Sequence, residues 1–218
     1  MKILAFDTST TACSVAIQNG DQIKCLHQIA PMQQAKLILP MIHELLEASS
    51  VTLEQLDAIA YGCGPGSFTG IRIASSVVQG IGFGTQKPII KISSLAALAQ
   101  AAYLEQHCAK MLIAVDARMD QIYWACYEAG KTGCVELVDQ ELLCRPEDVS
   151  IPVANDWSGV GDGWGIYTQQ ISSRLGFTPS SIYSSQLPSA QAMLQLARIK
   201  YDKNEWIAAS EAVPVYLR

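Results

Sequence analysis

The sequence predicts an α/β fold built from two copies of one small unit. Each half of the chain begins with a short apolar run that ends in aspartate, Ile3–Asp7 in the first half and Leu112–Asp116 in the second. A short polar turn and another apolar segment follow each aspartate, Cys13–Ile17 and Ile122–Tyr127 respectively. Chance can produce so short a match, but the shared strand–turn–strand context favours duplication.

The first half is expected to open with a β-meander. Ile3–Phe6 and Cys13–Gln18 are apolar segments of strand length. The Asn19-Gly20 pair tolerates positive φ and is a strong hairpin signal, so Gln22–Ile29 is expected to return as a third strand. The polar segment Asp7–Thr10 is then the first turn of the meander.

A first helix is expected from Gln33 to Ser49, because apolar residues recur there at helical spacing. Pro40 either kinks this helix or marks its start. Thr52–Gln55 has the capping-box pattern of a short helix, and Ala58–Cys63 has the composition of a strand. The apolar positions of the first helix form two neighbouring stripes: Leu37, Met41 and Leu45, and Ile38, Ile42 and Leu46.

The glycine-rich loop Gly62–Gly70 leads into a second helix, Ile71–Gly84, whose single charged residue is Arg72. A helix this apolar is buried on most sides. Pro88–Ser93 is expected to be a strand, and Ser93 or Ser94 to cap an alanine-rich helix that ends near Gln106.

The second half repeats the pattern, with strands at Met111–Asp116 and Ile122–Tyr127 and a third segment, Val135–Leu143, that completes the meander. The glycine-rich turn Val160–Gly165 precedes a helix, and a last helix is expected at Ser189–Tyr201 with Ser189 as its cap. We expect two lobes, residues 1–107 and 108–218. The helix after the glycine-rich turn is expected at Ile166–Leu175.

Two meanders, each with an acidic first turn and helices behind it, are typical of the actin and hexokinase superfamily, in which these turns surround the phosphates of ATP. Asp7, Thr8 and Ser9 have suitable chemistry, because hydroxyls and turn N–H groups bind phosphate and aspartate can hold magnesium through water. Asp116 begins the corresponding second turn. The alternative is an ordinary polar turn in which Asp7 accepts backbone hydrogen bonds.

The loop residues Gly64, Gly66 and Ser67 precede a helix N-terminus, which is a natural anion site. The loop is not a P-loop, because the required lysine is missing. It is not a nucleophile elbow either, because Pro65 and Thr69 stand where that motif needs glycines. Ser67 is therefore predicted to cap the helix rather than to act as a nucleophile.

Composition limits the function classes. Half of the residues are hydrophobic, 16% are charged and the net charge is −5, so the chain can bury a large core but has no evident basic patch for nucleic acid. The seven cysteines include no C-x-x-C pair, and no two histidines are four residues apart, which argues against disulfide and metal frameworks. No leader or membrane segment is evident, and we expect a cytoplasmic protein.

The segment Gly64–Arg72, GPGSFTGIR, resembles the signature of the bacterial TsaB (YeaZ-like) family, the accessory subunits for threonylcarbamoyladenosine synthesis on tRNA. The resemblance implies a duplicated actin-like fold of two small lobes, each a mixed β-sheet with flanking helices, and no independent catalysis. One departure is Gln34, where family members often carry histidine. Other segments agree in order: Ile3–Ser9, Ala12–Ala16, Ile38–Pro40, Val115–Met119, Val160–Gly161, Gly163–Trp164 and Pro214–Arg218.

The resemblance also implies partners. The homologous catalytic subunit, of TsaD type, transfers threonylcarbamoyl to the tRNA adenosine next to the anticodon and pairs with the accessory subunit through helices of the N-terminal lobe. An ATPase subunit of TsaE type joins them, and the chain contacts tRNA only as part of the complex. Two possibilities stay undecided: that the isolated chain forms a homodimer, and that it binds ATP or ADP weakly as a vestige. No cofactor is expected to be required.

Both helices of the first lobe are expected to form the docking surface. The first helix has two apolar stripes where packing on its own sheet needs about one. Small residues at four-residue spacing line the second helix and allow close approach of another helix. The alternative is that this face meets the same molecule. The expected interface residues are Leu37, Met41, Leu45, Arg72, Ser76, Gly80 and Gly84.

Two points stay open at this stage. Arg118 either reaches a partner carboxylate or phosphate, or pairs locally with aspartate to order its turn. The alternative function is an autonomous enzyme of the same superfamily, either an ATP-binding phosphotransferase or a metallopeptidase-like hydrolase. The absent H-E-x-x-H motif argues against the hydrolase, and the short second lobe against the phosphotransferase.

Overall fold

The computed structural model describes residues 1–153 and 156–217. The chain divides into two compact units. Unit 1 comprises Met1–Ala97 and Pro188–Val215, and unit 2 comprises Leu98–Leu187 with Tyr216 and Leu217. This division differs from the expected lobes 1–107 and 108–218, because helix α5 (Ala190–Asp202) returns to unit 1 and packs on its first two strands.

Unit 1 contains a five-stranded mixed sheet in the order β3-β2-β1-β4-β5. The first three strands form the predicted antiparallel meander, and β4 and β5 run parallel to β1. The hairpin between β2 and β3 is confirmed, with Gly20 at positive φ in its turn. The strands are β1 (Lys2–Asp7), β2 (Ala12–Asn19), β3 (Gln22–Ile29), β4 (Ala58–Gly62) and β5 (Ile89–Ile92).

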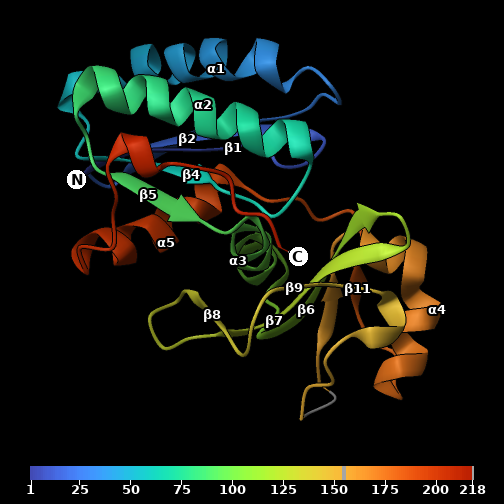
Figure 1. Cartoon of the computed structure of the whole chain (residues 1–218). Coiled ribbons are helices and arrows are strands. Elements are labelled where there is room, and N and C mark those ends of the chain that lie inside the picture. Colours follow the sequence, from blue (N-terminus) through green and yellow to red (C-terminus); the bar gives the residue numbers. More distant parts are fainter. Residues whose placement is uncertain (154–155, 218) are drawn as a thin grey trace. The chain divides into compact units, whose positions relative to one another are not determined.

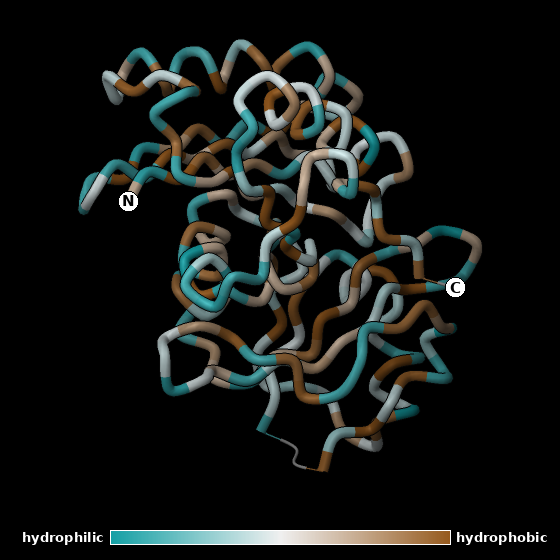
Figure 2. Tube along the Cα trace, turned by 60° about the vertical axis from the view of Figure 1, so that its left-hand side comes forward, coloured by the Kyte–Doolittle hydropathy of each residue, from teal (hydrophilic) through white to brown (hydrophobic). Residues whose placement is uncertain are grey.

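Helices cover both faces of this sheet. α1 (Gln34–Ser49) and α2 (Phe68–Thr85) lie over one face and α5 over the other (Figure 1). The alternation along β1 explains the two layers, because Leu4 and Phe6 join the core under α1 and α2, whereas Ile3 and Ala5 join the core under α5. Hydrophobic and hydrophilic residues alternate along the helices at the top of Figure 2, as expected for helices with one buried side.

The two apolar stripes of α1 both pack inside unit 1, so this part of the predicted docking surface is wrong. Met41 and Leu45 are 6% and 3% exposed and belong to the core, and Leu37 packs against the same core. α1 lies beside α2 and over β2, so it can bury a wide arc of its surface against its own chain. The prediction had assumed that the helix packs on its sheet through about one apolar stripe.

Unit 2 has the same strand order and directions as unit 1, with β6, β7 and β8 forming the meander and β10 and β11 parallel to β6. This identity of topology confirms the duplication. Val135–Leu143, expected as one strand, forms two short strands that both pair with β7. The strands are β6 (Lys110–Arg118), β7 (Gln121–Ala129), β8 (Val135–Leu137), β9 (Leu142–Cys144), β10 (Ser158–Val160) and β11 (Ile182–Tyr183).

The remaining helices follow the prediction with small shifts. α3 (Ser94–Gln106) is capped by Ser93, whose hydroxyl accepts hydrogen bonds from two N–H groups of the first turn. α4 (Gly163–Leu175) starts within the glycine-rich turn and packs on β6. Ser189 occupies the N-cap position of α5, but its side chain makes no capping hydrogen bond. Among the described residues, no helix is both long enough and apolar enough to cross a membrane.

Candidate functional site

The first turn lies at the end of β1 and is buried. Asp7, Thr8 and Ser9 are at most 2% exposed. One carboxylate oxygen of Asp7 accepts hydrogen bonds from the backbone N–H and the hydroxyl of Ser9, at 2.8 and 2.7 Å. The other accepts a hydrogen bond from the hydroxyl of Ser94, at 2.9 Å. The carboxylate therefore orders the turn from within, as the polar-turn alternative predicted.

Burial raises the pKa of Asp7 above its usual value, and the hydrogen bonds from Ser9 and Ser94 only partly oppose that shift. Because the folded-state pKa lies above the unfolded one, the folded state holds the extra proton between the two values. The free energy of unfolding therefore falls as the pH rises through that window, from about pH 4 upward.

Asp7→Asn is expected to flatten this pH dependence. The amide oxygen can still accept from Ser9, and the amide N–H can donate to the Ser94 hydroxyl, so the turn keeps its hydrogen bonds without a buried charge. Urea unfolding from pH 4 to 7 measures the effect. Asp21→Asn, at the exposed β2–β3 turn, is the control. An Asp7→Asn variant as pH-dependent as the natural chain would contradict the prediction.

The glycine-rich loop packs directly onto this turn. Ser67 N donates to Ser9 O at 2.8 Å, and the Thr8 hydroxyl donates to Gly70 O at 2.7 Å. A Cβ on Gly66 would lie 2.6 Å from Ser9 O, and one on Gly70 would lie 2.0 Å from Thr8 O. Only glycine permits this approach, and the loop backbone occupies the space over the turn.

These residues do not fit the phosphates of a nucleotide, which the superfamily resemblance implied. The hydroxyls of Thr8 and Ser9 are buried and donate to acceptors of the same chain. Gly64 approaches Val215 O, to which a Cβ would lie at 3.0 Å, and so also packs inward. A phosphate-binding turn presents such groups to the ligand instead.

Ser67 caps α2, as predicted, although the hydrogen bond from Gly70 N to its hydroxyl is long at 3.5 Å. The helix begins at Phe68, three residues earlier than expected. Gln34, noted only as a departure from the family pattern, donates from Nε2 to Thr10 O at 2.7 Å. It joins the start of α1 to the first turn.

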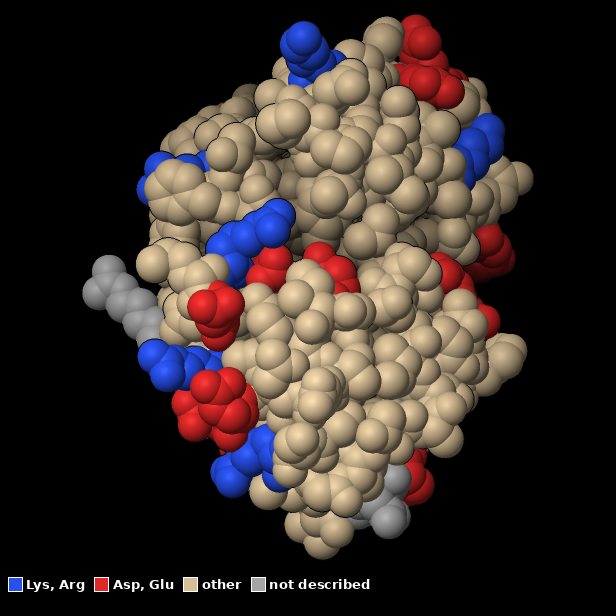
Figure 3. Space-filling view, turned by 90° about the vertical axis from the view of Figure 1, so that its right-hand side faces the viewer, with Lys and Arg blue, Asp and Glu red and all other residues tan. Residues whose placement is uncertain are grey.

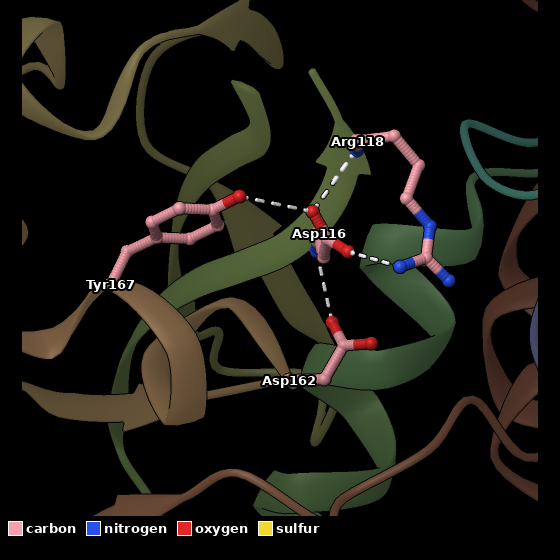
Figure 4. A network of polar contacts seen from close by, with 4 residues as sticks. All are labelled: Asp116, Arg118, Asp162 and Tyr167. Atoms are coloured by element: carbon pink, nitrogen blue, oxygen red, sulfur yellow. Dashed lines mark hydrogen bonds and ion pairs between the residues drawn. The ribbon is translucent and has the colours of Figure 1, made fainter. Parts of the chain in front are cut away.

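The second turn is a polar network centred on Asp116 (Figure 4). Its carboxylate pairs with the Arg118 guanidinium at 3.1 Å and accepts hydrogen bonds from Arg118 N at 3.0 Å and the Tyr167 hydroxyl at 3.4 Å. Asp116 N donates to Asp162 at 2.9 Å. Burial, and secondarily the Asp116 charge, raises the pKa of Asp162. The local pair predicted as one role of Arg118 is therefore present.

The tip of this turn has an unusual backbone. Arg118, Met119 and Asp120 have φ values of 66°, 55° and 56°, three consecutive residues in the left-handed region. The side chain of Arg118 is 87% exposed, and Met119 is 90% exposed. Asp116 and Asp162 lie behind the tip, and two carboxylates disfavour a phosphate there.

The candidate metal ligands and the thiols are located as follows in the part of the chain that the structure describes. No group of three or more His, Cys, Asp or Glu residues is placed to hold a metal ion there. The cysteines are free thiols, and burial raises the pKa of Cys13 to about 12 and that of Cys126 to about 11. Such thiols are poor nucleophiles.

The outward face of α2 is open. A Cβ on Gly80 or Gly84 would meet no atom within 4 Å, and Ser76 is exposed. The alternative in which these small residues pack inside the same molecule is therefore wrong for both glycines. At the two ends of this face, Phe68 and Phe83 are 60% and 58% exposed.

Arg72 belongs to the same face, and its guanidinium lies 3.7 Å from the centre of the Phe68 ring. Gly82 is the contrasting glycine of α2, because a Cβ there would lie 2.8 Å from the Cβ of Ala209 and 3.0 Å from Ile89 Cδ1. One side of the helix therefore packs tightly inward, and Gly80 and Gly84 lie on the other side with open space at their Cβ positions. We call Phe68, Arg72, Ser76, Gly80, Phe83 and Gly84 the α2 face.

Sequence reasoning missed the residues that complete each network. Ser94, which bonds Asp7, is 87 residues away from it in the sequence. Asp162 and Tyr167 are likewise distant in sequence from Asp116. One indication was present in the sequence for each of two residues. Asp162 lies in the glycine-rich turn Val160–Gly165, and Ser94 was proposed as a possible helix cap. Two surface hollows, of about 580 and 380 Å³, lie along α4 and beside Trp206, away from both turns.

Comparisons with known proteins agree with this fold. Residues 28–196 match the family model described as TsaD, tRNA N6-adenosine threonylcarbamoyltransferase. The tRNA threonylcarbamoyladenosine biosynthesis protein TsaB of Escherichia coli is 36% identical over 100% of this chain and 95% of its own. The TsaB protein of Haemophilus influenzae is 38% identical over 100% and 94%.

A solved structure, YeaZ from Pseudomonas aeruginosa, superposes with a TM-score of 0.93 at 42% identity and covers 99% of both chains. The likeness extends over both units, so the duplicated fold, with a mixed sheet and flanking helices in each half, is that of this relative. The chain therefore belongs to the TsaB (YeaZ) family and has its role in the biosynthesis of tRNA threonylcarbamoyladenosine.

Proposed function

We propose that this chain is a non-catalytic, cytoplasmic accessory subunit. It supports threonylcarbamoyl transfer to the tRNA adenosine next to the anticodon by forming a heterodimer with the homologous catalytic subunit. An ATPase subunit completes the assembly, and no cofactor bound to this chain is required.

The α2 face is the observation that carries the proposal. Two glycines inside a helix cost up to about 1 kcal/mol each relative to alanine, and neither Gly80 nor Gly84 has an internal contact that explains it. Glycines allow the backbone of a partner helix to approach closely, and Phe68 and Phe83 supply apolar area on either side. We expect a homologous partner to have a helix at the equivalent position, because residues 28–196 of this chain match the family model of the transferase.

The buried first turn supports the non-catalytic part of the proposal. Asp7, Thr8 and Ser9 make hydrogen bonds within the chain and are closed over by the glycine-rich loop. We infer that the role of the turn is structural, because its polar groups bond to other parts of the same chain. Arg118 and Met119 of the second turn are exposed and are available for contact with a partner.

The direct test mixes the pure chain with the homologous catalytic subunit and measures the mass of the product by size-exclusion chromatography with light scattering. The expected result is one complex with a single copy of each subunit. Separate elution of the two proteins at micromolar concentration would overturn the proposal.

The isolated chain is expected to bind tRNA weakly, with no better than roughly micromolar affinity at physiological salt. The net charge is −5, and the face seen in Figure 3 carries few charged side chains, with positive and negative groups interspersed. Electrophoretic mobility shift with the pure chain measures this. Nanomolar binding of tRNA by the chain without any partner would contradict the claim that the chain contacts tRNA only as part of the complex.

A further inference from the structure

A hollow of about 380 Å³ lies at the C-terminal end of α2, wholly within unit 1. One wall is the end of α2 and the turn that follows it. The other wall is the segment after α5, which lies against that end of the helix (Figure 1). We call this site the Trp206 hollow, and it is lined by residues 82–83, 86–88 and 206–210.

The walls of the Trp206 hollow are held in place by unit 1 itself. Ile207 exchanges two backbone hydrogen bonds with Ile89 of β5, at 2.9 and 3.0 Å. A Cβ on Gly82 would lie 2.8 Å from the Cβ of Ala209, so the helix and the segment after α5 are in close contact. The hollow is therefore formed before anything binds, which lowers the ordering cost of binding.

Two aromatic residues line this hollow and keep much of their surface exposed. Phe83 is 58% exposed and Trp206 is 45% exposed. The other three tryptophans of the chain are at most 3% exposed, so Trp206 is the exception. Tryptophan is enriched among the residues that dominate binding energy, because it buries a large rigid surface. An exposed tryptophan at a preformed, mostly apolar hollow therefore indicates a binding site.

The Trp206 hollow is continuous with the α2 face, because Phe83 belongs to both. A helix turns by about 100° per residue, so Phe83 lies about 60° around the helix from Gly80. It lies on the side toward Gly82, which contacts the segment after α5. A partner helix that packs on Gly80 and Gly84 therefore passes directly beside the hollow.

The α2 face is too small to form a stable interface by itself. Such an interface buries roughly 800 Å² on each partner, whereas the α2 face is one side of a single helix of 18 residues. The two apolar stripes of α1 pack inside unit 1, and its exposed pair His43 and Glu47 is polar. The Trp206 hollow supplies the adjoining apolar area that a larger interface requires.

We propose that the Trp206 hollow takes an apolar side chain of the catalytic subunit and forms a second anchor of the heterodimer. This inference rests on the proposed function, because it assigns a further contact to the same partner. The lining favours an aliphatic or aromatic side chain, since Phe83, Pro88 and Trp206 are apolar. Among the lining residues, all of which the structure describes, Lys87 is the one charged group, and it disfavours a cationic side chain.

Fluorine NMR of the chain labelled with 5-fluorotryptophan tests the occupant of the hollow directly. The chain has four tryptophans, and the resonance of Trp206 is identified by its loss in Trp206→Phe. Unlabelled catalytic subunit is expected to shift this resonance and to abolish its solvent isotope shift in D₂O. The three buried tryptophans are the internal references.

The same samples are examined by light scattering, which separates the possible failures. A complex that forms while Trp206 stays exposed to solvent overturns the assignment of the hollow and leaves the proposed function standing. If no complex forms, both fail. A Trp206 resonance that shifts with the concentration of the pure chain assigns the hollow to a second copy and also overturns the inference.

Two substitutions test the energetic part of the inference by titration calorimetry with the catalytic subunit. Trp206→Ala removes the exposed aromatic ring, and Ala208→Leu fills the hollow from an exposed position. Each is expected to keep the fold, as judged by circular dichroism, and to weaken binding at least about tenfold. Val213→Ala is the matched control, because Val213 is 49% exposed on the same segment but does not line the hollow. Normal affinity in either test variant overturns the inference.

Discussion

Gly70→Ala is expected to destabilise the protein by roughly 3 kcal/mol, which lowers Tm by about 6–12 °C in a chain of this size. A methyl group at this position would lie 2.0 Å from the backbone oxygen of Thr8. Backbone atoms cannot rotate away as a side chain can, so either the first turn or the start of α2 must shift. The hydrogen bond from the Thr8 hydroxyl to Gly70 O is then strained as well.

Gly80→Ala is the matched control, since both glycines lie in α2 and only one has a neighbour at the Cβ position. Alanine at position 80 is expected to stabilise the helix by up to about 1 kcal/mol. Thermal and urea unfolding of the two variants, measured side by side, give the difference. Equal stabilities would show that the glycine-rich loop does not pack on the first turn as described.

Gly80→Leu is expected to keep the fold and to weaken binding of the catalytic subunit by at least about 100-fold. The leucine side chain extends into open space on the isolated chain, so the melting temperature should be unchanged or slightly higher. In the complex it would hold the partner helix away from the α2 backbone and separate the surfaces around Phe68 and Phe83.

Co-purification and titration calorimetry with the catalytic subunit measure this effect. Ser173→Leu, at an exposed position on α4, is the control for adding a leucine to a helix surface. Met41→Leu is a second control, because it conserves volume in the core and should change little. A Gly80→Leu variant that binds with normal affinity would place the interface elsewhere.

The sequence was sufficient to predict most elements, because their periodicities are local. The strands of both meanders and the helices were confirmed within a few residues, and the Ile3–Asp7 and Leu112–Asp116 match correctly indicated duplication. The domain boundary was less predictable. Nothing in Ser189–Tyr201 alone shows that its apolar face packs under β1 rather than in unit 2.

Local sequence patterns did not predict how the interiors of the turns are packed. Gly64, Gly66 and Ser67 of the glycine-rich loop were predicted to form an anion site. In the structure, the glycines at 62, 66 and 70 instead allow the side chain and backbone of Asp7–Ser9 to approach closely. Contacts between segments distant in sequence decide such cases, and the sequence alone does not define them. The same reason explains why Met41 and Leu45 were assigned to an interface, although they lie in the core.

Reconstituted threonylcarbamoyl transfer to tRNA tests most directly whether this chain supports the reaction without contributing chemistry. The assay combines the chain with the catalytic subunit and the ATPase subunit, and compares the natural chain with Ser67→Ala and Gly80→Leu. Loss of the Ser67 cap costs about 1 kcal/mol of stability. We predict no product from the chain alone, full turnover with assembled Ser67→Ala, and almost none with Gly80→Leu. Product formation by the chain alone, or loss of turnover in a Ser67→Ala complex that assembles normally, would contradict the account.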